Sequence, residues 1–170
     1  EAPNHRPIIS ESSRPCFAGA EFGPVELQHT QLAAECSFPL DFRCVSANKF
    51  DVTSSEIVRR LNLSEAHIEG DVVVEGAVFE SGFNCEGARI EGTLNFVGAE
   101  FHRPVSLNGI ETDGDLVLTG ATFHAGLDCS DIDIGGNLEM DGIEVGDQAS
   151  FVDVSVNGDV SATKATFSEG

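Results

Sequence analysis

The sequence has no tryptophan, no tyrosine and one methionine, so its 12 aromatic residues are all phenylalanine. It has no run approaching the ~20 apolar residues of a membrane-spanning helix and no recognisable secretory signal peptide. We therefore expect no direct membrane insertion. The apolar share of 41% over 170 residues is that of a folded domain with a sizeable core, and it is too high for a disordered chain.

Basic residues are also scarce. Nine lysines and arginines face 29 acidic residues, which gives a formal net charge of −20, and residues 104–170 hold 13 acids and one base, Lys164. Such a surface repels nucleic acid and anionic membranes and attracts cations or basic proteins. We expect no nucleic-acid ligand, and the charge favours a protein partner or a cation. The alternative is an acidic protein without an electrostatic partner.

Cysteine is present but lacks the arrangement of a metal centre. There is no C-x-x-C pair and no histidine at metal-ligand spacing from the five residues, which are Cys16, Cys36, Cys44, Cys85 and Cys129. An odd number leaves at least one thiol free. A disulfide between Cys36 and Cys44, in a less regular part of the chain, stays open as an alternative.

What the sequence does have is an 11-residue repeat that runs without a slip from Ala66 to Gly170. Position 1 is Ala, Ile or Val, position 3 is apolar except at Thr112, and positions 7 and 9 are apolar throughout. Alternate windows differ in type, so the full unit has 22 residues. One half carries glycine at position 5 and the other usually carries phenylalanine at position 3: Gly70, Gly92, Gly114, Gly136 and Gly158, and Phe79, Phe101, Phe123 and Phe167.

The spacing within each window favours strands. An 11-residue repeat also fits three turns of an α-helix, but positions 1 and 3, and positions 7 and 9, have the period of a strand. An interior glycine would cost about 1 kcal/mol in each helical window. We therefore predict four short strands per 22-residue coil. Inward side chains of one coil should stack on like side chains of the next, about 4.8 Å away.

Two further positions follow from this register. Position 11 is mostly glycine, with Asp131, Asp153 and Lys164 as exceptions, and it is expected to have the positive φ of a corner. Cys85 and Cys129 both fall at the inward position 9, two coils apart. Their Cα atoms should therefore be roughly 10 Å apart, which exceeds the ~7 Å that a disulfide can span. We expect both in the core.

The domain boundaries follow the regularity of the repeat. We assign a leader or cap to residues 1–19 and a β-helix domain to residues 20–170, with irregular coils over 20–54 and regular coils over 55–170. Cys44 with Phe50 is expected to keep the register, whereas the window from Ala34 is one residue short. A short helix from Ser55 to Leu61 is an alternative.

The last coil is incomplete, since the sequence stops halfway through a window. We expect either dimerisation or continuation of a longer polypeptide through this open coil. The first residues fit either the N-terminus of a processed chain or an arbitrary start of the sequence. We slightly favour an extracytoplasmic over a cytoplasmic location.

Five triplets resemble the Ala-x-Leu/Phe core of pentapeptide-repeat proteins: Ala66–Ile68, Ala77–Phe79, Ala88–Ile90, Ala99–Phe101 and Ala121–Phe123. The units are also similar to the A-x-I-x-G-x-L-x-L-x-G repeats of long bacterial proteins. The resemblance covers about residues 20–170. It implies an all-β, right-handed parallel β-helix of quadrilateral cross-section, here with about seven coils. The 22-residue coil is longer than that of true pentapeptide repeats.

Two groups of outward residues are candidate metal sites. Five carboxylates expected at one corner would repel one another, and a hard cation such as Ca²⁺ would relieve the repulsion; they are Glu111, Asp128, Asp131, Asp133 and Asp153. Position 4 of successive coils carries Glu80, His102 and His124, which could bind a transition metal or hold a catalytic proton. For both groups the alternative is a solvated surface row. We assign no catalytic and no cofactor-binding residue.

The sequence best fits a non-catalytic scaffold that presents an acidic surface to another protein. Inward positions are used for packing, and the windows have no long insertions in which an active site could be built. The resemblance implies a sharper form, a mimic of the charge of DNA that occupies a DNA-binding protein. The alternatives are a carbohydrate-active β-helix enzyme with paired acids in a cleft and a cation-binding surface domain.

Overall fold

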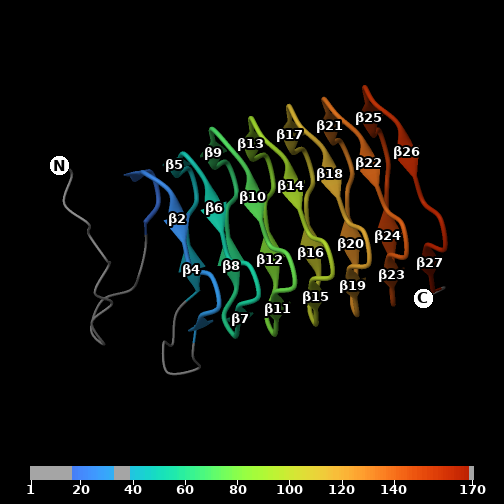
Figure 1. The fold of residues 1–170 in the computed structure, drawn as a ribbon, viewed down its shortest axis with the longest axis horizontal. Coiled ribbons are helices and arrows are strands. Elements are labelled where there is room, and N and C mark those ends of the chain that lie inside the picture. The colour runs from blue at the N-terminus through green and yellow to red at the C-terminus, as the bar shows by residue number, and fades with distance from the viewer. Residues whose placement is uncertain (1–16, 33–38, 169–170) are drawn as a thin grey trace.

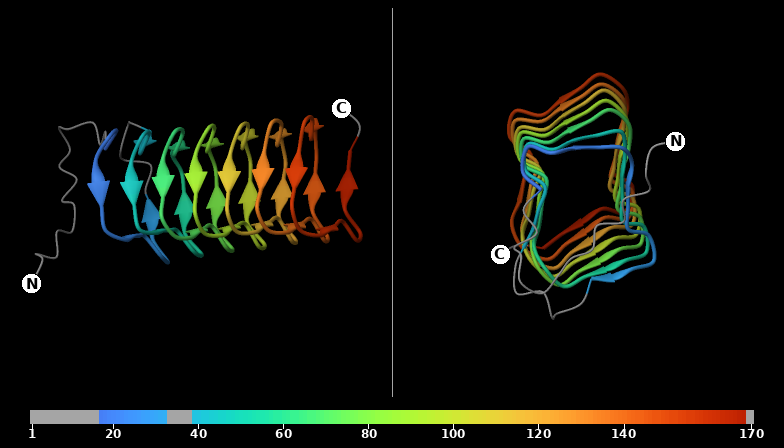
Figure 2. Two further views of the ribbon diagram at one scale, coloured as in Figure 1. Left: turned by 90° about the horizontal axis from the view of Figure 1, so that it is seen from above. Right: turned by 90° about the vertical axis from the view of Figure 1, so that its left-hand side faces the viewer.

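Four parallel sheets surround an apolar interior in the computed structural model, which describes residues 17–32 and 39–168 (Figure 1). Every strand has two residues, and each strand from β1 to β23 pairs in parallel with the strand four places further along the chain. Seen along the axis, the chain traces a quadrilateral (Figure 2). The described residues form an all-β solenoid and contain no helix.

Each sheet receives strands from successive turns. Sheet 1 contains β1 (Glu21–Phe22), β5 (Ser46–Ala47), β9 (His67–Ile68), β13 (Arg89–Ile90), β17 (Glu111–Thr112), β21 (Asp133–Ile134) and β25 (Ser155–Val156). Sheet 2 contains β2 (Val25–Glu26), β6 (Phe50–Asp51), β10 (Val72–Val73), β14 (Leu94–Asn95), β18 (Leu116–Val117), β22 (Leu138–Glu139) and β26 (Val160–Ser161). Sheet 3 contains β3 (Gln31–Leu32), β7 (Glu56–Ile57), β11 (Val78–Phe79), β15 (Glu100–Phe101), β19 (Thr122–Phe123), β23 (Glu144–Val145) and β27 (Thr166–Phe167). Sheet 4 contains β4 (Leu40–Asp41), β8 (Leu61–Asn62), β12 (Phe83–Asn84), β16 (Val105–Ser106), β20 (Leu127–Asp128) and β24 (Ala149–Ser150).

The strands β1 to β24 make six complete turns, and β25 to β27 form three sides of another. This number is slightly below the seven coils that the sequence predicts. The regular step is 22 residues, as from His67 to its partner Arg89, so the prediction of four strands per 22-residue coil is confirmed. The alternative helix at Ser55–Leu61 is wrong, because β7 and the start of β8 occupy that segment. Among the described residues, no helix is long and apolar enough to cross a membrane.

Position 11 has positive φ, as predicted. Six glycines from Gly76 to Gly142 hold this position with φ between 61° and 66°. Asp131, Asp153 and Lys164 adopt the same conformation, with φ of 56°, 53° and 60°. A glycine has no Cβ to clash there, and aspartate tolerates the left-handed region better than most residues. A corner of this left-handed type therefore follows every second strand.

One corner near the N-terminal end of the solenoid is shorter than the others of the regular turns. Two residues lie between the inward Ala47 and Phe50, whereas three lie between Ile68 and Val72. Strand β5 consequently pairs with β9 21 residues later, because Ser46 lies opposite His67.

Because of this short corner, the predicted position of Cys44 in the repeat is wrong. Val45 is the buried residue at the start of its window, and Cys44 is exposed at the corner with φ of 54°. The missing residue falls after Ala47, so Cys44 occupies position 11 and not an inward position. Ala34, where the sequence predicts the short window, lies outside the described residues, as do Cys16 and Cys36.

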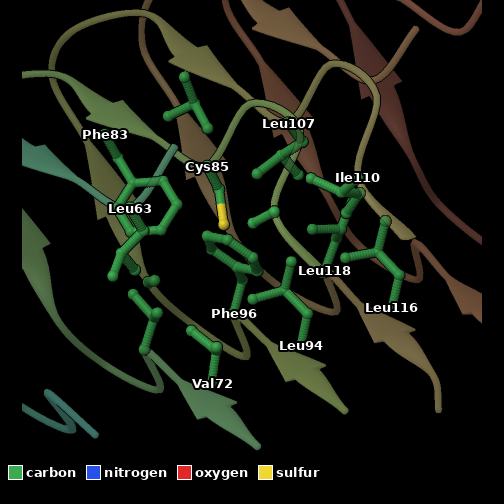
Figure 3. Close-up of a cluster of buried hydrophobic side chains, with 14 of the residues drawn as sticks. Leu63, Val72, Phe83, Cys85, Leu94, Phe96, Leu107, Ile110, Leu116 and Leu118 are labelled. Carbon is green, nitrogen blue, oxygen red and sulfur yellow. The ribbon is translucent and has the colours of Figure 1, made fainter. Parts of the chain in front are cut away.

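The inward side chains form columns along the solenoid. The rings of Phe79 and Phe101 stack with centroids 4.8 Å apart, and those of Phe101 and Phe123 with centroids 5.0 Å apart. Another column runs through Val72, Leu94, Leu116 and Leu138, and Figure 3 shows part of the core around it. Each fully buried side chain of this size contributes roughly 1.5–3 kcal/mol. A turn buries its inward face only against neighbouring turns.

Glycine at position 5 allows successive turns to approach closely. The Gly114 N–H donates to the Gly92 carbonyl at 3.1 Å, and a Cβ on Gly114 would lie 2.6 Å from that oxygen. Gly136 repeats this arrangement on Gly114, with a donor–acceptor distance of 2.9 Å. The glycine that distinguishes one half of the 22-residue unit is therefore a steric requirement of this corner.

Candidate functional site: a histidine–glutamate cluster and an acidic corner

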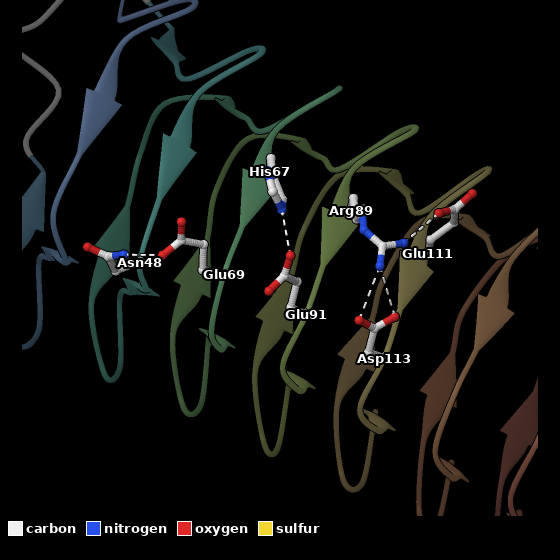
Figure 4. Close-up of polar contacts among 7 residues, drawn as sticks. All are labelled: Asn48, His67, Glu69, Arg89, Glu91, Glu111 and Asp113. Atoms are coloured by element: carbon white, nitrogen blue, oxygen red, sulfur yellow. Dashed lines mark hydrogen bonds and ion pairs between the residues drawn. The ribbon is translucent and has the colours of Figure 1, made fainter.

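Outward side chains also form columns, and several pair diagonally between turns. On sheet 1, the Asn48 amide donates to Glu69, and His67 Nε2 lies 3.0 Å from Glu91 Oε1 (Figure 4). Arg89 donates to Glu111 at 2.9 Å and also contacts Asp113, as Figure 4 shows. In the last two turns of this series, a residue on one strand contacts the residue just past the next strand. The parallel register sets this geometry.

The same diagonal geometry on sheet 3 builds a cluster of four residues, Glu80, Glu100, His102 and His124, which we call the His–Glu cluster. Glu100 lies on β15, and the other three each follow a strand of this sheet directly. His124 Nε2 lies 2.8 Å and His102 Nε2 lies 3.4 Å from Oε1 of Glu100. The two imidazole rings stack with centroids 4.8 Å apart.

The sequence predicts the histidine column of this cluster but misses Glu100. Glu80 Oε1 lies 3.8 Å from His102 Nε2, so the predicted neighbours are adjacent. Glu100 is closer than Glu80 to His102, which lies two residues further along the same turn, and it also reaches diagonally to His124 at position 4 of the next turn. Residues two apart on a strand share a face. The outward position 2 of the window that contains His102 could therefore have indicated Glu100 as a further member of the cluster.

The predicted calcium ligands are more widely spread. Glu111 lies on sheet 1 and is held by Arg89. Asp128 lies on sheet 4 and accepts a hydrogen bond from the Ser130 N–H at 3.0 Å. Within the described ranges, Glu100, His102 and His124 form the one group of three or more acidic, histidine or cysteine residues whose ligand atoms all lie within 4.8 Å of one another.

Four of these acids mark the edge between sheets 4 and 1 in the fifth and sixth turns, and we call them the acidic corner: Asp128, Asp131, Asp133 and Asp153. Asp131 and Asp153 occupy the same corner position one turn apart, and both are exposed, as is Asp133. Their side chains extend into solvent as a row of separate carboxylates. A calcium site here stays a prediction.

The charge balance changes along the solenoid. In the described part of the chain, every ion pair involves an acid at or before Asp113. Beyond Asp113, no acid of the described residues is in an ion pair, although the acids continue to Asp159. The early turns therefore neutralise part of their charge internally. The described acids of the later turns have no cationic partner, although Asp115, Asp128 and Asp141 accept hydrogen bonds from the chain.

One acid is buried near the start of the solenoid. Asp51 on β6 is 3% exposed, and it accepts hydrogen bonds from Lys49 at 2.8 Å, Thr53 at 2.7 Å and Gln28 at 2.6 Å. Burial alone would raise the pKa of Asp51, but these donors stabilise the carboxylate and hold the pKa well below its usual range. Each polar atom is satisfied, which indicates a structural role.

The buried thiols agree with the prediction from sequence. Cys85 and Cys129 are 1% and 0% exposed, and both are unpaired. Figure 3 shows the sulfur of Cys85 among the side chains of the core. Burial raises the pKa of Cys85 to about 12 and also raises the pKa of Cys129. Neither thiol is in an environment that supports nucleophilic chemistry.

The outer faces carry no walls between residues 39 and 168, since consecutive strands are joined by two to four residues. An open depression lies over sheet 4 and is bordered by Pro104, Gly126, Asp128, Asp147 and Gln148. Comparison of the chain with protein-family models, with curated proteins and with solved structures gives no match. A proposal about function therefore depends on the arrangement of the residues in this structure.

Proposed function

We propose that this protein is a non-catalytic repeat scaffold that binds a basic protein through the acidic surface of its fifth and sixth turns. The observation that carries the proposal is the break in charge compensation after Asp113 among the described residues. Unpaired surface carboxylates repel one another and attract cationic groups. A basic partner would supply the counter-charges that the described part of the chain supplies only to its earlier turns.

The spacing of the acidic corner favours a protein over a single ion. Asp131 and Asp153 occupy equivalent positions on successive turns, and strands of one sheet lie about 4.8 Å apart. Separate carboxylates on a rigid edge can each receive a different lysine or arginine side chain. The hydrogen-bonded strands fix these positions in advance, so binding needs little ordering of the scaffold.

Short connections and a filled interior favour a scaffold over a carbohydrate enzyme. Such an enzyme needs carboxylates facing each other across a substrate cleft, whereas strand connections of two to four residues leave the sheet faces without walls from residue 39 to residue 168. We further propose the right-handed, pentapeptide-repeat-like form of this solenoid. In that form, a DNA-binding protein is a candidate for the basic partner, since the acidic turns would imitate the charge of DNA.

Affinity capture with a charge variant tests the proposal. The test variant replaces four acids of the acidic corner, with Asp128→Asn, Asp131→Asn, Asp133→Asn and Asp153→Asn. The control changes the charge by the same amount where carboxylates already have partners, with Glu69→Gln, Glu91→Gln, Glu111→Gln and Asp113→Asn. Asparagine retains the left-handed tolerance that Asp131 and Asp153 need.

We expect the wild type and the control to retain the same basic protein at low salt and the test variant to lose it. The wild type should also release it at high salt, because the screening length falls from about 10 Å at 0.1 M to about 3 Å at 1 M. Calorimetry with the purified partner then measures the affinity. Retention of no protein at low salt, or equal retention by both variants, would contradict the proposal.

A further inference from the structure

We propose that the His–Glu cluster on sheet 3 is a binding site for a divalent transition-metal ion of the Zn²⁺ type. The inference is independent of the proposed partner, because the cluster lies on a different sheet from the acidic corner. It brings two imidazole nitrogens and two carboxylates together. Imidazole nitrogen and carboxylate oxygen are common ligands of zinc.

The ligand distances suit such an ion. Zinc binds histidine nitrogen and carboxylate oxygen at about 2.0–2.2 Å, so neighbouring ligands of a tetrahedral ion lie about 3.4 Å apart. Glu100 Oε1 lies 3.4 Å from His102 Nε2 and 2.8 Å from His124 Nε2. Glu80 Oε1, at 3.8 Å from His102 Nε2, is close enough to complete a set of four after a rotamer adjustment.

The backbone holds these residues in place. The N–H groups of Glu80, His102 and His124 donate to carbonyls of the preceding turn at 3.0, 2.9 and 2.9 Å. Phe79, Phe101 and Phe123, which directly precede them, are buried in the stacked column. Each ligand is therefore attached to a fixed strand end, and little backbone entropy opposes metal binding.

The site spans three successive turns. Glu80 follows a strand of the third turn, Glu100 and His102 belong to the fourth, and His124 follows a strand of the fifth. A bound ion would link these turns through side chains in addition to the backbone hydrogen bonds. The cluster is partly exposed, which leaves an entry path from solvent and room for a water ligand. We infer a clamp on the middle of the solenoid.

The chain contains a matched control on sheet 1. His67 and Glu91 form a histidine–carboxylate pair with an Nε2–Oε1 distance of 3.0 Å, but among the described residues no second histidine stands beside them. His67→Gln removes one histidine from such a pair, and His124→Gln removes one from the cluster. All measurements use a Cys16→Ser, Cys36→Ser, Cys44→Ser background, because thiolates also bind zinc.

Calorimetric titration with Zn²⁺ alone is the test, with Ca²⁺ and Mg²⁺ as comparison ions. We expect one Zn²⁺ per chain, unchanged binding in the His67→Gln protein, and binding at least about 100-fold weaker in His124→Gln, since loss of even an outer-shell partner costs about 10–100-fold. Zn²⁺ should also raise the thermal midpoint, by an amount that grows with the logarithm of the free Zn²⁺ concentration above the Kd.

A second variant separates the metal site from the hydrogen bonds alone. Glu100→Gln keeps a hydrogen-bond acceptor for both histidines but weakens a carboxylate ligand, so we expect Zn²⁺ affinity to fall while the midpoint without metal changes little. Circular dichroism checks that each variant is folded. Absence of saturable Zn²⁺ binding, equal binding by the two histidine variants, or equal affinity for Ca²⁺ would overturn the proposal.

Discussion

The ring of Phe101 lies on that of Phe123 with the planes inclined by 3°, and directly outside them His102 lies on His124 with the planes inclined by 10°. The last residues of these two strands therefore form one stack inside the sheet, and the residues that directly follow them form another outside it. Both stacks follow from the register that pairs Phe101 with Phe123. The interior stack supports the fold, and the exterior stack brings ligands together.

Removal of one ring from the inner stack should destabilise the whole solenoid. Phe101 is fully buried and contacts rings on both neighbouring turns, so Phe101→Ala is expected to lower the free energy of unfolding by about 3–5 kcal/mol. Urea unfolding followed by circular dichroism measures the loss. Ser155→Ala, at an exposed outward position, should change it by less than about 0.5 kcal/mol. A loss below about 1 kcal/mol at Phe101 would contradict the stacked column.

The close approach of successive turns at the position-5 glycines leads to a second prediction. In Gly114→Ala the added methyl would lie 2.6 Å from the Gly92 carbonyl, which is backbone and cannot rotate away. We expect a loss of about 1–3 kcal/mol, typical of overpacking. In the comparison variant Gly120→Asn, the new side chain meets open space at a φ that asparagine tolerates. Its thermal midpoint should stay near that of the wild type, and equal losses in the two variants would refute the steric explanation.

Buried Asp51 should stabilise the fold only while it is ionised. Its pKa in the folded protein lies below the ordinary value, so the stabilisation is fully present above about pH 4 and is lost as the pH falls through the lowered pKa. Asp51→Asn should therefore cost about 1–3 kcal/mol at pH 7. The stability difference between wild type and variant should shrink below pH 4. A difference that is constant from pH 7 to pH 2 would contradict this interpretation.

Thiol reactivity should separate the corner cysteine from the core cysteines. Cys44 is exposed, whereas burial raises the pKa of Cys85 to about 12 and leaves almost no thiolate there at pH 8. We expect an aromatic disulfide reagent to label Cys44 in the native protein and to label Cys85 and Cys129 only after unfolding. Peptide mapping by mass spectrometry identifies the labelled sites. Rapid native labelling of Cys85 would place it outside the core.

The sequence predicts the repeating parts of this molecule well because each inward position recurs in several turns. Phe79, Phe101 and Phe123 could be assigned to one buried column from their spacing alone, and the structure confirms this. The prediction for Cys44 was wrong because a cysteine fits an inward position as well as Val45 does. The missing residue lies in a corner, where the apolar pattern of the sequence does not reveal its absence.

The candidate site was harder to predict than the core. Glu100 belongs to the His–Glu cluster through a diagonal contact, which a comparison of equivalent positions does not reveal. The ion pairs of Arg89 with Glu111 and Asp113 likewise depend on side-chain reach across turns. Periodicity predicts which residues share a column, whereas pairing between columns depends on rotamers.

The two-residue corner between Ala47 and Phe50 shows where this architecture tolerates a change in chain length. The residue missing there is not one of the inward residues of the strands, so the strands on both sides keep their partners. Chain length can therefore change at this N-terminal corner without a shift of the strand register on either side. For protein engineering, a peptide is better grafted here than at the same edge of the later turns, where the close approach of Gly92, Gly114 and Gly136 leaves no room for added atoms.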